Sequence, residues 1–66
     1  MAVAKTIEII SSSSAGIEAA VRDGIAKASE TVNGIEGAWV QDIKVIVRDN
    51  KVAEWRVTLK VTFVVS

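Results

Sequence analysis

The sequence predicts an α+β domain of β-α-β-β order in which a sheet and one helix share a core. Three observations predict this class: a β-branched segment near the N-terminus, a stretch with apolar residues at helical spacing, and two long strand-like segments joined by a two-residue turn. No proline interrupts these segments. With 66 residues the chain can form only one domain, which we take as residues 1–66.

The first strand is predicted from Val3 to Ile10, which reads VAKTIEII, because β-branched residues favour extended backbone. Four serines follow it, Ser11 to Ser14. A serine hydroxyl can accept a hydrogen bond from an unpaired amide of a first helical turn, so we expect Ser13 or Ser14 to cap the helix. No base or glycine-rich framework accompanies the serines, which argues against a nucleophilic or phosphate-binding role.

The helix is predicted from Ala15 to about Val32, and Asn33-Gly34 is expected to end it because both residues tolerate a left-handed cap. Gly24 lies within the apolar stripe, where glycine costs about 0.5–1 kcal/mol relative to alanine. We therefore expect it to mark a close approach to the sheet or to a second subunit. The stripe comprises Ile17, Ala20, Val21, Gly24, Ile25, Ala28 and Val32.

Two strand-like segments, Ala38 to Arg48 and Lys51 to Val65, flank Asp49-Asn50, a dipeptide suited to a tight hairpin turn. That turn sets a register for the two strands. The predicted cross-strand pairs are Arg48 with Lys51, Val45 with Glu54, Ile43 with Arg56, Gln41 with Thr58 and Trp39 with Lys60.

This register sorts the hairpin residues onto two faces. The core face is expected to carry Ala53, Trp55, Val57, Leu59, Val61 and Phe63. The second face is expected to carry Trp39, Gln41, Ile43, Val45 and Val47 beside Val52, Glu54, Arg56, Thr58, Lys60 and Thr62. One helix cannot cover so mixed and extended a face, which indicates a protein partner.

Composition narrows the classes of function. Eight basic and eight acidic residues give a net charge of zero, without the basic surplus of nucleic-acid binders. The chain has no cysteine or histidine, so disulfides and the commonest zinc ligand are absent, and self-association remains as the aid to stability that so small a chain needs. The N-terminal segment lacks an apolar run long enough for a signal peptide or membrane span, so we expect a cytoplasmic location and no membrane partner.

The residue types also argue against an enzyme. Histidine, cysteine and tyrosine are all absent, and the eight acidic residues are scattered without a matched pair for acid–base catalysis. In a symmetric oligomer, one carboxylate per subunit can still form a ring around an axis and hold a hard cation. The sequence does not assign that role to any particular acid.

Four stretches together resemble the dodecin family: the strand ending in EII, the SSxxGIEAAV helix start, the TV helix end and the closing WRVTLKVTF strand. The resemblance covers essentially the whole chain. It implies a three-stranded antiparallel sheet partly wrapped around one helix, and twelve copies closed into a hollow homododecameric shell. It also implies the storage or sequestration of a flavin (riboflavin, FMN or FAD), without catalysis.

The resemblance places the family's two flavin contacts on positions that differ in this chain. The stacking tryptophan falls on Gly37, and the glutamine that binds the ring edge falls on Arg56. Trp39 is two residues beyond Gly37, on the same face of the strand, and offers a stacking surface displaced by about 6.6 Å. The candidate ligand-binding residues are therefore Trp39, Gln41 and Arg56.

Two hypotheses remain open. In the first, the shell binds or stores a small ligand, with Trp39 as the stacking surface. In the second, the chain is similar to a calcium-dodecin-type subgroup that lacks the flavin tryptophan and carries arginine at the glutamine position, and the shell binds a divalent cation or is purely structural. Trp39 is then an interface anchor, and Arg56 pairs with Glu54 or with an acid of a neighbouring copy.

Overall fold

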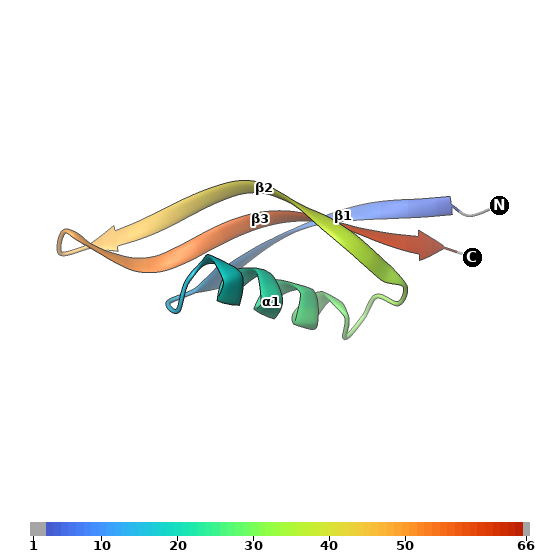
Figure 1. Ribbon diagram of the computed structural model, residues 1–66, viewed down its shortest axis with the longest axis horizontal. Coiled ribbons are helices and arrows are strands. Elements are labelled where there is room, and N and C mark those ends of the chain that lie inside the picture. The colour runs from blue at the N-terminus through green and yellow to red at the C-terminus, as the bar shows by residue number, and fades with distance from the viewer. Residues whose placement is uncertain (1–2, 66) are drawn as a thin grey trace.

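The computed structural model describes residues 3–65 as a three-stranded antiparallel sheet with one helix against it (Figure 1). The elements in chain order are β1 (Val3–Ser13), α1 (Ile17–Ala28), β2 (Ile35–Arg48) and β3 (Lys51–Val65). The strand order is β1-β3-β2, so the C-terminal strand is central and the other two strands are edges. The helix packs on β1 and β3. The predicted β-α-β-β fold is confirmed.

The start of the helix differs from the prediction. Strand β1 pairs with β3 without interruption as far as Ser13, and α1 begins only after Gly16. Gly16 has a φ of 143°, which favours glycine, and no side chain caps the helix. The capping role predicted for Ser13 or Ser14 is therefore wrong, because pairing with β3 holds the chain extended as far as Ser13 and Gly16 is the residue that precedes the helix. The Ser13 hydroxyl instead accepts a hydrogen bond of 3.0 Å from the amide of Ala15 and shapes the turn.

The helix also ends earlier than predicted, at Ala28 rather than near Val32. The predicted helix end at Asn33-Gly34 is wrong, although Gly34 does have a left-handed φ of 77°. Its carbonyl accepts a hydrogen bond of 3.0 Å from the amide of Val64, so it ties the connection between α1 and β2 to the central strand. The Gly34 conformation thus serves the sheet rather than the helix.

The core lies between α1 and the central strand. Ala20 of the helix and Val57, Leu59 and Val61 of β3 have no exposed surface. Around them pack the half-buried side chains of Ile7, Ile9, Val21, Ile25 and Ile35. The predicted core row is confirmed at its centre, while Trp55 and Phe63 are only half-buried. The small size of this core leaves much of the sheet outside it.

The Asp49-Asn50 turn is confirmed. Both residues have positive φ values, 54° and 61°, as a type I′ hairpin turn requires. The predicted pairs Arg48 with Lys51 and Trp39 with Lys60 are present. The turn therefore fixes the register at its own end of the hairpin.

The middle of the hairpin departs from the predicted register because each strand contains a bulge. Ala53 in β3 and Gln41 in β2 have no partner across the ladder. The first bulge shifts the pairing by one residue and the second restores it. The observed pairs in this stretch are Ile46 with Glu54, Val45 with Trp55, Lys44 with Arg56, Ile43 with Val57 and Asp42 with Thr58.

This shift moves side chains to the other face of the sheet. A displacement of one residue exchanges the two faces of a strand, so Ile43 and Val45 lie on the α1 side, opposite Val57 and Trp55. Val47 and its cross-strand partner Val52 also lie on the α1 side. The prediction that Ile43, Val45, Val47 and Val52 share a face with Trp39 is therefore wrong. We call the face opposite α1 the helix-free face.

The molecule is elongated, with extents of 51 × 19 × 14 Å. The length comes from the β2–β3 hairpin, which projects beyond α1 at the end opposite the two termini (Figure 1). Strand β1 stops pairing at Trp55, so residues 46–54 form a ribbon of two strands. Among residues 3–65, no helix is long and apolar enough to cross a membrane.

Candidate functional site

The helix-free face holds two of the three residues predicted to bind a ligand. Its cross-strand rows follow from the pairing of β1, β3 and β2. One row places Glu8, Lys60 and Trp39 side by side, and another places Ser12, Arg56 and Lys44 side by side. Trp39 and Arg56 thus share a face, but their rows are four residues apart on β3, which corresponds to about 13 Å.

Trp39 is the most distinctive feature of this face. Its side chain is 64% exposed, a large apolar area for an indole. Gly37, two residues earlier, has no side chain, and a Cβ there would meet only the Thr62 hydroxyl oxygen at 3.5 Å. That hydroxyl donates a hydrogen bond of 3.0 Å to the Gly37 carbonyl. The indole therefore stands beside open space on the strand.

Gln41 is the bulged residue of β2, and its side chain is exposed. A bulge redirects the side chains around it and increases the local twist. The simple alternation of the sequence does not fix the face of Gln41. The trio of Trp39, Gln41 and Arg56 is consequently not one contiguous patch within a single copy.

Arg56 forms an ion pair within its own chain. Its guanidinium Nη2 donates to Glu54 Oε1 at 2.9 Å, which confirms the predicted pairing with Glu54. Arg48 lies 3.7 Å from the other oxygen of the same carboxylate. Glu54 thus pairs with two arginines, Arg48 beside the hairpin turn and Arg56 further along β3.

Within residues 3–65 of one copy, the carboxylates are not gathered into a metal site. In the part of the chain from residue 3 to 65, no three side chains of histidine, cysteine, aspartate or glutamate gather as metal ligands. The arrangement predicted from symmetry, with one carboxylate from each of several subunits, requires further copies.

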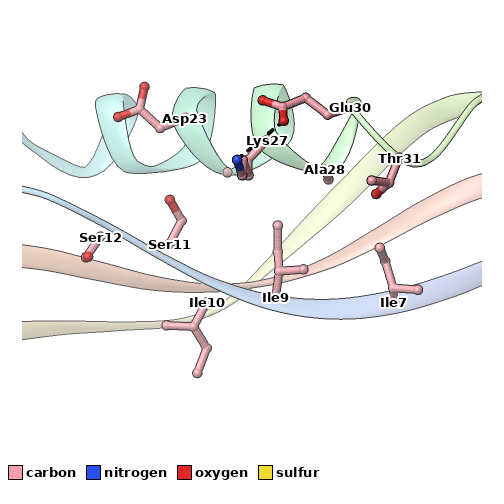
Figure 2. A pocket seen from close by; sticks show the side chains of 11 residues that line it. Ile7, Ile9, Ile10, Ser11, Ser12, Asp23, Lys27, Ala28, Glu30 and Thr31 are labelled. Carbon is pink, nitrogen blue, oxygen red and sulfur yellow. Dashed lines mark hydrogen bonds and ion pairs between the residues drawn. The ribbon is translucent and has the colours of Figure 1, made fainter.

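The structure also contains a groove that the sequence did not indicate. It has a volume of about 740 Å³ and lies between α1 and the free edge of β1, so we call it the α1/β1 groove (Figure 2). Ile9 and Ser11 point from the strand toward the helix, whereas Ile10 points away from it. The lining is Ile7, Ile9, Ile10, Ser11, Ser12, Asp23, Gly24, Lys27, Ala28, Glu30 and Thr31. Periodicity alone could not reveal the groove, because it depends on where the helix crosses the sheet.

Comparison with known proteins agrees with this architecture. A solved dodecin from Streptomyces davaonensis has a TM-score of 0.94 and 29% identity, over 98% of this chain and 96% of that one. A dodecin from Streptomyces coelicolor has a TM-score of 0.94 and 28% identity, over 98% and 93% of the two chains. A variant of the T. thermophilus dodecin has a TM-score of 0.95 and 29% identity, over 100% and 98%.

The sequence comparison extends this agreement from fold to family. No curated protein matches the chain significantly. The Dodecin family profile, however, matches residues 3–66, nearly the full length of the chain. The chain therefore belongs to the dodecin family.

Proposed function

We propose that this chain assembles with copies of itself into a dodecin-type hollow shell of twelve subunits that binds a small ligand without catalysis. Family membership supports a ligand-binding shell. The subunit itself supports assembly, because it exposes 4785 Å², whereas a compact monomer of 7.0 kDa exposes about 4,000 Å². The excess surface includes large apolar side chains on both faces of the sheet.

The observation that carries the ligand proposal is the exposure of Trp39 on the helix-free face. An indole that is 64% exposed is a ready stacking surface for a planar ring. Its cross-strand partner is Lys60, whose ammonium group can attract an anionic substituent of the same ligand. We take a flavin as the ligand because it combines a planar ring system with a polar or phosphorylated tail. Gln41 and Arg56 supply polar contacts from the same copy or from a neighbouring one.

A riboflavin fluorescence titration of the purified oligomer tests this proposal. Stacking on an indole quenches flavin emission, so we expect saturable quenching that is lost in Trp39→Ala. Trp55→Phe is the matched control, because Trp55 lies on the α1 side of the sheet and its replacement leaves the helix-free face intact. Both variants are first checked for unchanged particle mass.

The ion pair between Arg56 and Glu54 favours a second candidate function. Arg56 lies 2.9 Å from the carboxylate of Glu54 in its own chain. Because this ion pair stabilises the hairpin, the Arg56 guanidinium is less available to a ligand. On this alternative the shell binds a divalent cation through carboxylates of several copies, or is structural. An assembled shell that leaves riboflavin emission unchanged excludes the flavin proposal, and metal analysis of the same particles then distinguishes the two remaining roles.

A further inference from the structure

One row of the helix-free face places an acidic, a basic and an aromatic side chain side by side. Glu8 lies opposite Lys60, and Lys60 lies opposite Trp39, so the three residues come from β1, β3 and β2 in turn. Neighbouring strands of a sheet are about 4.8 Å apart, so Glu8 and Trp39 are separated by about 10 Å across Lys60. A planar ligand that stacks on Trp39 and extends across the strands therefore reaches Lys60 first and Glu8 second.

The two charged groups of this row are not used by the chain itself. Within residues 3–65, neither Glu8 nor Lys60 takes part in an ion pair or in a side-chain hydrogen bond. By contrast, Arg56 on the same face is held by Glu54 at 2.9 Å. The polar atoms beside the exposed indole are thus those of Lys60 and Glu8.

The two residues offer opposite hydrogen-bonding groups. A lysine ammonium has donors only, and an ionised carboxylate has acceptors only. Lys60 is half-buried on the central strand, whereas Glu8 is exposed on the edge strand β1. Partial burial lowers the local dielectric around Lys60 and strengthens a hydrogen bond made there. The row therefore presents a strong donor and an acceptor at adjacent positions.

The pyrimidine ring of a flavin carries the complementary pattern. Its imide edge presents a carbonyl oxygen, an N–H and a second carbonyl oxygen in sequence. A carboxylate accepts from the N–H, and an ammonium group donates to a neighbouring carbonyl oxygen. Hydrogen bonds in which one partner is ionised are shorter and stronger than those between neutral groups. The row thus fits a ring that stacks through its face and forms hydrogen bonds through its edge.

We propose that Glu8 and Lys60 recognise the imide edge of a ring stacked on Trp39, with Glu8 accepting the imide N–H and Lys60 donating to an adjacent carbonyl oxygen. This inference rests on the proposed flavin site and assigns two specificity-determining residues to it. The ligand class narrows to planar heterocycles with a free imide N–H. A ring without that group leaves the site's polar atoms unpaired, which is how a hydrogen-bonding site rejects an analogue.

Riboflavin and its N3-methyl derivative test the role of Glu8, because methylation replaces the imide hydrogen and leaves the ring face and the ribityl tail unchanged. Fluorescence quenching gives the affinity of each flavin for the assembled oligomer. We expect the methylated flavin to bind about tenfold more weakly, as for the loss of one hydrogen bond to a charged group. Glu8→Ala should bind the two flavins equally. The matched control is Asp23→Ala, which removes a carboxylate from α1 instead and should keep the preference.

Lys60 is tested with riboflavin alone, which has no phosphate, so a change in affinity reports on the ring rather than on a charged tail. Lys60→Met removes the ammonium group and keeps an apolar stem, and we expect it to weaken riboflavin binding about tenfold. Lys60→Arg keeps a cationic donor and should retain most of the affinity.

The outcomes separate this inference from the flavin site on which it rests. Equal affinities of the two flavins for the unaltered oligomer, or an unchanged riboflavin affinity in Lys60→Met, would overturn the edge assignment. Quenching that depends on Trp39 would then leave the flavin site in place. An oligomer that quenches neither flavin would instead remove the proposed flavin site, and this inference with it.

Discussion

Gly24 shows how one residue sets the distance between α1 and the sheet. A Cβ at this position would lie 2.9 Å from the Cβ of Ser11 and 3.0 Å from Cδ1 of Leu59. The sequence predicted a close approach here, and the structure identifies the partner as the sheet of the same copy. The helical penalty of glycine is thus offset by tight packing against β1 and β3.

We expect Gly24→Ala to lower the free energy of unfolding, although alanine is the better helix former. The overpacking cost of about 1–3 kcal/mol exceeds the helical gain of about 0.5–1 kcal/mol. Urea unfolding followed by circular dichroism measures the difference. Ser11→Gly removes the nearer contact and should recover part of the loss in the double variant. Higher stability of Gly24→Ala alone would contradict the packing described for α1.

At the same scale, the sequence anticipated some site residues better than others. The Arg56–Glu54 pair could be predicted, because residues two apart on a strand share a face. The exposure of Trp39 followed from its register opposite Lys60. The position of Gln41 was not predicted, although the sequence carries a sign of the bulge: two successive polar residues, Gln41 and Asp42, interrupt the alternation between Val40 and Ile43.

Among the elements, the hairpin turn is the one that its own residues specify most directly. Both Asp49 and Asn50 occupy the left-handed region, which aspartate and asparagine tolerate and β-branched residues do not. Asn33 is also an asparagine, but its φ is not positive. The turn therefore depends on backbone conformation rather than on residue type alone.

We expect Asn50→Gly to raise the free energy of unfolding by about 0.5 kcal/mol, because glycine adopts a positive φ without steric cost and Asp-Gly is a preferred type I′ sequence. Asn33→Gly is the matched control and should lower stability by a few tenths of a kcal/mol, because it gains only unfolded-state entropy. Denaturant midpoints of the two variants provide the comparison. Equal effects of the two substitutions would be inconsistent with a left-handed conformation at Asn50.

At the scale of the whole molecule, the buried core is small compared with the apolar side-chain surface that is exposed. Four side chains, those of Ala20, Val57, Leu59 and Val61, form the fully buried cluster of the described residues. Exposed valines and isoleucines lie on both faces of the sheet, including the part of the β2–β3 hairpin that extends beyond β1. A core this small supports only a few kcal/mol of stability, which is the physical reason to expect association with further copies.

We expect the midpoint of thermal unfolding to rise with protein concentration, because dissociation accompanies the unfolding of a subunit that depends on its neighbours. Scans over a hundredfold range of concentration, at fixed pH and salt, measure this dependence. Particle mass determined over the same range is the control. A constant midpoint together with a monomeric mass would contradict an assembly-dependent fold.

The sequence by itself determined the order of the elements, the hairpin turn, the apolar stripe of the helix and the centre of the core. Each of these depends on local chemistry or on a short repeat, which neighbouring residues specify. Only the tertiary structure decided the start of α1, the bulges at Gln41 and Ala53, the face of Ile43 and Val45, and the α1/β1 groove. These features depend on pairing and packing between distant segments, and one unpaired residue is enough to exchange the faces of a strand.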